Sequence, residues 1–253
     1  MRRVIAVANQ KGGVGKTTTV VNLGAALADL GYRVALIDLD SQGAMTVSFG
    51  LNPYTTKPSM VNLLLNKDIA LSDVAKSVAE RLQVAPAGSD LLSAEYRLLK
   101  QPDRTTRLRD AIEKSRDDVD YVLIDTPPNL GLLTVNGLVA ANQLLIPVKT
   151  EYLAMRGVRP LLESVWLIRD RINPDLQLLG VVPTMHGASP NADAIVSEMS
   201  KVFRNKLLKS TIPMDEAAAV APASRQTVLD YRPASRAAVA YRELAKEVSD
   251  VLR

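Results

Sequence analysis

The feature that most constrains this chain is a glycine-rich segment near its start, which lies between an apolar run and a helical pattern. The segment reads Lys11-Gly12-Gly13-Val14-Gly15-Lys16-Thr17-Thr18. Residues 4–8 before it are typical of a buried parallel strand. Residues 17–30 after it carry apolar side chains at helical spacing, and Gly31 supplies a stop. Glycines at such a junction let backbone N–H groups point inward beside a helix N-terminus, so the segment predicts a cradle for phosphate groups.

The residue types in this cradle suggest separate tasks. Lys16 is expected to reach the β- and γ-phosphates, Thr17 to offer its hydroxyl to Mg²⁺, and Thr18 to cap the α-phosphate. The generic pattern Gly-x-x-x-x-Gly-Lys-Ser/Thr needs a glycine where the chain has Gln10, but the variant Lys-Gly-Gly-x-Gly-Lys-Thr-Thr is complete. The strand before it and the helix after it disfavour a plain glycine turn, so we expect ATP and Mg²⁺ as cofactors.

The rest of the chain alternates strand and helix patterns. Further strands are predicted at residues 33–38, 82–85, 119–124, 143–148 and 178–183, and helices at residues 91–100, 105–114, 132–141, 156–172 and 191–203. This alternation predicts an α/β fold, a single doubly wound, mostly parallel sheet flanked by helices. We expect residues 49–68 to be a surface excursion. The length suits one large core, so residues 1–253 are predicted to form a single domain.

Carboxylates follow two more of the predicted strands. Asp38 and Asp40 come at the end of the second strand, and Asp125 ends the apolar run 122–125 before two prolines. Ligands of open α/β sheets gather at the carboxyl ends of the strands, where a carboxylate suits the hydration shell of Mg²⁺. Alone, the pair would be interpreted as a solvated turn and Asp125 as a helix cap. Beside a phosphate cradle, we interpret all three as site residues.

Composition excludes several other kinds of site. The chain has no cysteine, which rules out disulfides, iron–sulfur clusters and thiolate zinc sites, and its lone His186 makes a histidine-based metal site implausible. No stretch approaches 18 apolar residues, and the run after Met1 is too short for a signal peptide. We therefore expect a cytoplasmic protein with no membrane partner. The net charge of +4 is compatible with a polyanionic partner.

Three sequence blocks, at residues 8–19, 37–43 and 124–131, carry a resemblance to a known family. Through them the chain resembles the ParA/MinD family of P-loop ATPases, most closely its short chromosomal ParA (Soj-like) branch, with weaker similarity at residues 147–154 and 231–236. The resemblance implies Mg²⁺-dependent hydrolysis of ATP to ADP and phosphate by a homodimer that forms in the ATP state.

The resemblance also implies roles for single residues. Lys11 would cross a two-fold axis to the partner subunit's nucleotide, with Gly12 allowing the close approach, and Asp40 would orient the attacking water. The catalytic residues expected are Lys11, Lys16 and Asp40. Magnesium would be held, partly through water, by Thr17, Asp38 and Asp125. The expected nucleotide-binding residues are Gly12, Gly13, Val14, Gly15, Lys16, Thr17, Thr18, Pro213 and Met214.

Two segments depart from the family pattern. Ser41 and Ala44 replace the usual proline and asparagine after the second strand. Residues 214–224 replace an arginine followed by an Asn-Val-Arg-Leu-Ser-Glu-Ala-Pro-Ser-like stretch, so basic residues are missing there. Non-specific double-stranded DNA is nevertheless the partner implied for the ATP dimer. The candidate DNA contacts are Arg225, Arg232, Arg236 and Lys246, with scattered surface charges as the alternative.

The resemblance therefore implies a nucleoid-associated partition ATPase that segregates chromosome or plasmid DNA and is released when a ParB-like adaptor protein stimulates hydrolysis. Three alternatives stay open. They are a MinD-like membrane-associated regulator, a ParA-like positioner of a carboxysome or chemotaxis cluster, and a ligase that phosphorylates a small carboxylate. The last helix has an apolar stripe but mixed charges opposite it, which disfavours membrane anchoring.

Overall fold

One sheet organises the described part of the chain. The structure is a computed structural model that describes residues 2–116, 118–151, 157–188 and 190–252. Its strands are β1 (Arg3–Val7), β2 (Val34–Asp38), β3 (Lys76–Ala79), β4 (Leu82–Ala85), β5 (Tyr121–Asp125), β6 (Gln143–Lys149) and β7 (Gln177–Thr184). Their order is β3-β4-β2-β5-β1-β6-β7, and every neighbouring pair is parallel except β3 with β4. The predicted α/β fold with a doubly wound, mostly parallel sheet is confirmed.

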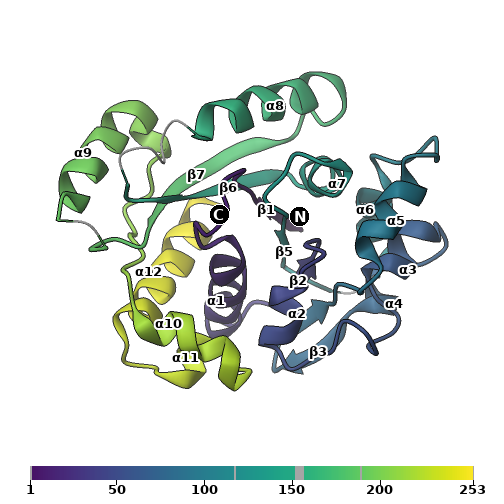
Figure 1. Ribbon diagram of the computed structural model, residues 1–253, viewed down its shortest axis with the longest axis horizontal. Coiled ribbons are helices and arrows are strands. Elements are labelled where there is room, and N and C mark those ends of the chain that lie inside the picture. Colours follow the sequence, from purple (N-terminus) through teal and green to yellow (C-terminus); the bar gives the residue numbers. More distant parts are fainter. Residues whose placement is uncertain (1, 117, 152–156, 189, 253) are drawn as a thin grey trace.

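Helices cover both faces of this sheet (Figure 1). They are α1 (Lys16–Asp29), α2 (Ala44–Ser48), α3 (Met60–Leu65), α4 (Leu71–Val74), α5 (Leu91–Leu98), α6 (Arg107–Lys114), α7 (Leu132–Ala140), α8 (Val158–Arg171), α9 (Ala192–Phe203), α10 (Glu216–Val220), α11 (Val228–Tyr231) and α12 (Arg236–Val251). Buried residues of α3 to α9 belong to one apolar cluster, and those of α1, α2 and α10 to α12 belong to a second.

Alternation along β1 shows how one strand serves both clusters. Val4 and Ala6 belong to the first cluster, whereas Ile5 and Val7 belong to the second, because successive side chains of a strand point to opposite faces. A strand buried on both faces needs apolar residues at every position. This explains why the sequence shows continuous apolar runs for the central strands.

Residues 49–68 are only in part the surface excursion that we expected. The first half lies at the surface, and Tyr54 is 78% exposed to solvent. The second half forms α3, in which Met60, Leu63 and Leu64 are at most 1% exposed. Ser59 and Asn62 form a capping box at its start. The expectation was wrong for this half because the prolines and polar residues at 52–58 obscure a short apolar helix that packs against α5 and α6.

Several short elements escaped the sequence patterns, among them α2, α4, α11, β3 and α10, and one prediction cannot be compared. The edge strand β3 is short and pairs antiparallel with β4, with alternating half-buried and exposed residues. The alanine-rich stretch after Asp215 forms α10, which that carboxylate caps by accepting a hydrogen bond from Ala217 N–H. Arg156, the predicted start of a helix, lies outside the described residues, as do residues 152–154 of the weaker similarity. None of the described helices is long and apolar enough to span a bilayer.

Candidate functional site

Three loops converge at the carboxyl edge of the sheet. The glycine-rich loop follows β1, while Asp38 ends β2 and Asp125 ends β5. These strands are neighbours, and Asp125 pairs in register with Val7 on one side and with Asp38 on the other. The fold therefore brings the predicted phosphate cradle and both strand-end carboxylates together, at the edge where open α/β sheets bind their ligands.

The glycine loop has the open backbone that a phosphate cradle requires. Gly13 and Gly15 have φ values of +68° and +87°, a region that side chains disfavour. A Cβ atom on Gly12, Gly13 or Gly15 would meet no atom within 4 Å in the part of the chain that the structure describes. Gly15 caps α1, whose first N–H groups face the loop. The space beside the loop is thus free for an anion at a helix N-terminus.

Hydrogen bonds from neighbouring strands brace this loop. The Thr184 hydroxyl donates to the carbonyl of Val14 at 2.8 Å. Asn9, which is 3% exposed, donates to the Pro147 carbonyl at 2.8 Å and accepts from Lys11 N–H at 3.0 Å. The loop is therefore held in shape by β6 and β7 before any ligand binds.

Lys16 begins α1 and is 7% exposed. Its Nζ donates to the Lys11 carbonyl at 3.4 Å. Burial lowers the pKa of Lys16, and the nearby carboxylates of Asp125 and Asp40 partly oppose this shift. An ammonium group that is poorly solvated and only loosely bonded is well prepared to bind a phosphate, because the new contact replaces its missing solvation.

The carboxylate of Asp125 is fully buried, and one of its two oxygens has a hydrogen-bond partner among the described residues. Its Oδ2 accepts a hydrogen bond from the Thr17 hydroxyl at 2.7 Å, whereas Oδ1 has no partner among the described residues. Burial, together with the charge of Asp38, raises its pKa well above the ordinary value. A hydroxyl and a carboxylate in contact, with an oxygen left over, fit the surroundings of a hydrated Mg²⁺ ion at the phosphate cradle.

Asp38 is buried in a more complete set of hydrogen bonds. Its Oδ2 accepts from the N–H of Thr46 at 2.9 Å and from the hydroxyl of the same residue at 2.7 Å. Its Oδ1 accepts from Asp40 N–H at 3.1 Å. Burial nevertheless raises the pKa of Asp38 to about 6. Asp40 lies half-buried at the rim, where Oδ1 accepts from Gln42 N–H at 3.0 Å.

The raised pKa of Asp38 gives a pH window in which stability changes, and the raised pKa of Asp125 acts in the same direction. Unfolded aspartates titrate near pH 3.9, so between about pH 4 and 6 the folded state binds more protons than the unfolded one. The stabilisation is complete below about pH 4 and is lost as pH rises through 6. Asp125→Asn removes one of the two buried charges. We expect it to raise the free energy of unfolding of the nucleotide-free protein at pH 7.5, because burial disfavours the charged form of Asp125.

Urea unfolding of both proteins at pH 4.5 and pH 7.5, without Mg²⁺, measures this effect. The gain from Asp125→Asn should be large at pH 7.5 and small at pH 4.5, because the native carboxylates are protonated at the lower pH. Equal differences at the two pH values would contradict the assigned cause. Asp68→Asn, between α3 and α4, controls for the loss of an exposed carboxylate.

Lys11 stands apart from the buried groups. Its side chain is 42% exposed, and its Nζ lies 3.4 Å from Oε2 of Glu151, whose other oxygen contacts Lys149 at 2.5 Å. These two lysines lower the pKa of Glu151. Lys11 therefore lies exposed at the rim of the cradle, and within the described residues its ammonium group is held by a surface ion pair, a weak interaction.

The remaining predicted nucleotide residues lie at the end of β7. Pro213 bridges to His186, and Met214 N–H donates to the carbonyl of that histidine at 2.8 Å. His186 follows Thr184, whose hydroxyl bonds the glycine loop. Pro213 and Met214 are thus placed near the loop through β7, and Met214 is 51% exposed. Their role stays a prediction.

The four candidate DNA contacts do not form one cluster. Arg225 lines a cavity of about 410 Å³ with residues that follow Asp40. Arg232 lies 6.0 Å from the Tyr231 ring, and Arg236 donates to the Met214 carbonyl at 3.0 Å. Lys246 lies about 15 Å further along α12 and pairs with Glu243 at 2.8 Å. Their role in DNA binding remains a prediction.

Both segments that depart from the family pattern contribute residues to the lining of one cavity of about 450 Å³. Ala44 comes from the first segment, and Ala218 and Pro222 come from the second. Thr17 and Thr18 also line this cavity, so the departures lie beside the first turn of α1.

Sequence reasoning missed some residues that support the site. Thr46 holds Asp38 and also accepts from Ala87 N–H at 2.9 Å. Thr126 donates to the Val7 carbonyl at 2.9 Å, and Thr184 braces the glycine loop. Each is a threonine at the end of a strand or in a short helix, a position that carries no distinctive spacing. Glu151 had a weak signal, since it follows the lysine that ends β6.

The fold and the glycine loop place the chain among P-loop nucleotide-binding proteins. A family model described as an AAA domain matches residues 2–178. The chain is 40% identical to sporulation initiation inhibitor protein Soj of Bacillus subtilis, over 98% of this chain and 99% of that one. It is 37% identical to chromosome partitioning protein ParA of Caulobacter vibrioides, over 97% and 93%. The chain therefore belongs to the ParA/MinD family of P-loop ATPases.

Solved structures agree with this assignment. Cobyrinic acid a,c-diamide synthase from Mycobacterium smegmatis, with bound ADP and magnesium, is 38% identical and has a TM-score of 0.84, covering 97% of this chain and 93% of that one. The septum site-determining protein MinD from Pyrococcus horikoshii, complexed with Mg-ADP, has a TM-score of 0.80 at 23% identity, covering 100% and 98%. The second likeness shows the fold alone.

Proposed function

We propose that this chain is a Mg²⁺-dependent ATPase that segregates chromosome or plasmid DNA. In this proposal ATP joins two subunits across Lys11, and the dimer binds DNA without sequence preference. A ParB-like adaptor then stimulates hydrolysis, which separates the subunits and releases the DNA. The relatives named Soj and ParA support this choice among the functions of the family.

The observation that carries the proposal is the position of Lys11 beside an open glycine loop. Lys16 would supply the cation for the chain's own phosphates, whereas Lys11 is exposed, and a Cβ on Gly12 would meet no atom within 4 Å among the described residues. A cation and a bare backbone at the rim of a phosphate cradle suit a site that a second subunit completes. There Lys11 would neutralise charge on the partner's transferred phosphoryl group, as an arginine finger does.

The surroundings of the cradle also suit Mg²⁺ and ATP. Thr17 would bind the ion directly, and Asp38 and Asp125 would hold its water ligands. The ion would neutralise charge on the phosphates during transfer. Because both carboxylates have raised pKa values, a divalent cation would also relieve the cost of their charges. Asp40, at the rim, would hold the attacking water.

Lys11→Ala tests the dimer. We expect ATP-dependent dimerisation to weaken about a hundredfold, because truncating one member of a desolvated charge pair costs several kcal/mol. Binding of ATP to the single subunit should change little. Light scattering with size-exclusion chromatography, in ATP and in ADP, gives the association state. Lys149→Ala is the matched control, since it removes the other lysine that contacts Glu151. Unchanged dimerisation of Lys11→Ala would show that the lysine does not act in trans.

Binding to DNA is tested separately. The affinity for random duplex DNA is measured in ATP, in ADP and without nucleotide, across a salt series. The proposal expects tight binding in ATP alone, with affinity falling steeply as salt rises because counterions are released. Equal binding in all three states would contradict the switch. Binding to anionic vesicles in place of DNA would favour the MinD-like alternative.

A second candidate function is the ATP-dependent amidation of a carboxylate substrate. The observation that favours it is the 38% identity to a structure named cobyrinic acid a,c-diamide synthase. The 253 residues contain no cysteine, so they lack the thiol nucleophile that could release ammonia from glutamine. Mass spectrometry after incubation with ATP, ammonium and cobyrinic acid tests this candidate. An amide product would establish it, and ATP turnover without one would favour the partition ATPase.

A further inference from the structure

Helix α5 presents large apolar side chains to solvent on one stripe. Leu92, Tyr96 and Leu99 are 53%, 67% and 51% exposed. They follow the i, i+4, i+7 spacing, so they lie along one side of the helix over about 10 Å. The inner side of α5 is already packed, because Leu91, Ala94 and Leu98 are at most 1% exposed and are part of the core. The exposed stripe therefore takes no part in packing α5 against the core.

Three basic residues flank this stripe and lack acidic partners. Arg97, Lys100 and Arg104 are exposed, and no ion pair involves any of them within residues 2–116 and the other described ranges. The nearby exposed carboxylate, Asp90, lies at the opposite end of α5. The C-terminal end of the stripe is thus positively charged.

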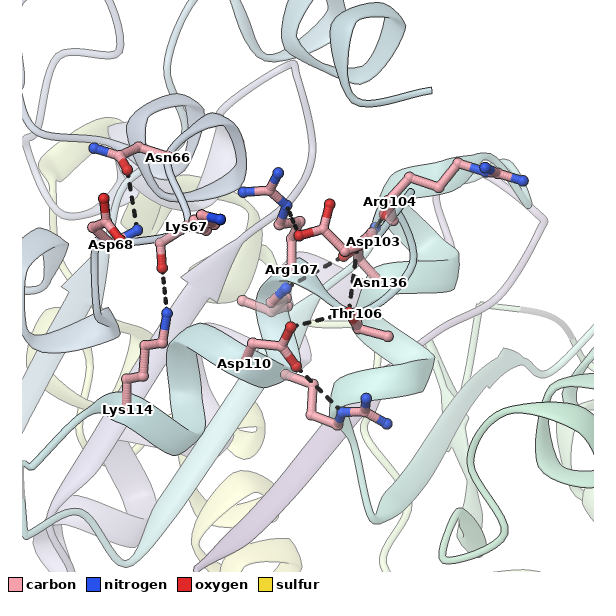
Figure 2. Close-up of polar contacts among 12 residues, drawn as sticks. Asn66, Lys67, Asp68, Asp103, Arg104, Thr106, Arg107, Asp110, Lys114 and Asn136 are labelled. Atoms are coloured by element: carbon pink, nitrogen blue, oxygen red, sulfur yellow. Dashed lines mark hydrogen bonds and ion pairs between the residues drawn. The ribbon is translucent and has the colours of Figure 1, made fainter. Parts of the chain in front are cut away.

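Asp103, an acidic residue next to Arg104 in the sequence, is used inside the protein. Asp103 pairs with Arg107 at 2.9 Å, and Arg107 is 7% exposed. Figure 2 shows Asp103 turned towards Arg107 while the side chain of Arg104 extends away from the other labelled residues. Asn136 donates to the Arg104 carbonyl at 2.7 Å and so fixes the loop. The backbone at Arg104 is therefore held in place, while the Arg104 side chain stays exposed and can contact a partner.

We infer that this surface, defined by Leu92, Tyr96, Leu99, Arg97, Lys100 and Arg104, docks an acidic amphipathic helix of a partner protein. The apolar stripe has the spacing by which one helix anchors on another, and its cations select glutamates or aspartates along the edges of the partner. A duplex DNA partner would leave three large apolar side chains without contacts. A bilayer would gain little from three apolar side chains spread over about 10 Å, because binding at the membrane interface scales with the apolar area that is buried.

A contact links this surface to the candidate site. Glu95 of α5 accepts a hydrogen bond from Leu133 N–H at 3.2 Å. Its Oε1 lies 2.6 Å from the position that a Cβ on Gly131 would take, so the two residues are in close contact. Gly131 belongs to the loop that begins at Asp125 and caps α7. Docking on α5 is therefore expected to alter ATP hydrolysis, a consequence that rests on the proposed function.

The probe is a synthetic helix-forming peptide with one leucine face and glutamates along both edges. Its affinity is measured by fluorescence anisotropy with the full chain, first without nucleotide. Leu92→Ser and Arg97→Glu are each expected to weaken binding at least tenfold, as anchor residues do. The matched controls are Leu167→Ser and Arg169→Glu on α8, whose side chains are also exposed. They should bind like the unaltered chain.

Each outcome decides the inference. Equal loss in the α5 and α8 variants, or equal binding of a scrambled peptide of the same composition, overturns it. Random duplex DNA or phosphatidylglycerol vesicles could also compete with the peptide. If Leu92→Ser weakens the binding of that competitor as much as it weakens peptide binding, the surface belongs to the competitor and the inference is overturned. A peptide that binds α5 but leaves ATP turnover unchanged overturns the link through Glu95. Absence of ATP turnover without peptide contradicts the proposed function and leaves the docking result standing.

Discussion

Lys16→Ala is expected to weaken ATP binding by two to three orders of magnitude. The lysine is buried beside the glycine loop, and its Nζ has a single long hydrogen bond to a carbonyl. Phosphate oxygens would therefore be its main partners. Losing one member of a desolvated charge pair costs about 3 to 4 kcal/mol, and each 1.4 kcal/mol is tenfold in affinity. Isothermal titration with ATP and Mg²⁺ measures the effect.

The apo fold should tolerate this substitution. Burial lowers the pKa of Lys16, so its charged form is already disfavoured in the folded state, and thermal unfolding should show little loss of stability. Lys201→Ala controls for the change in net charge, since that lysine lies on α9 in a surface pair with Glu198. An affinity for ATP within a few-fold of the unaltered chain would mean that the phosphates bind elsewhere.

The sequence predicts the core of this site well because the relevant signals are local. Each loop follows a continuous apolar strand, and parallel strands bring their carboxyl ends to one edge. The positions of Gly15, Lys16, Asp38 and Asp125 follow from that rule alone. The order of the strands is not local information. That β5 lies between β1 and β2, so that Asp125 neighbours Asp38, is known only from the structure.

Contacts over long sequence distances were beyond prediction. Lys11 is 140 residues from Glu151, and Thr46 gains its importance only once α2 folds back over Asp38. The exposed stripe of α5 is a different case. Its spacing indicated a helix, but in the sequence Leu92 and Leu98 look alike, and only the packing shows that one faces solvent and the other the core. Surfaces for partners are therefore harder to predict than strand-end sites.

Asp40→Ala is expected to slow ATP hydrolysis about a hundredfold or more while leaving ATP binding and dimerisation intact. Asp40 is half-buried at the rim, and its carboxylate accepts a hydrogen bond from Gln42 N–H. It is thus less buried than Asp38 and Asp125, which are fully buried. Orienting and deprotonating an attacking water contributes a factor of about 10² to 10⁴. The altered chain should accumulate as an ATP-bound dimer.

Two measurements separate this role from a structural one. Single-turnover hydrolysis gives the chemical step, and light scattering in ATP gives the lifetime of the dimer. Asp40→Asn keeps an oxygen for Gln42 N–H but removes the charge, so it should be slow as well if the carboxylate acts on water. If Asp40→Asn hydrolysed ATP normally while Asp40→Ala did not, the residue would serve only to shape the loop. Fast hydrolysis in both variants would mean that another group orients the attacking water. The two buried aspartates are poorly placed for that task, because Asp38 is hydrogen-bonded to Thr46 and Asp125 to Thr17.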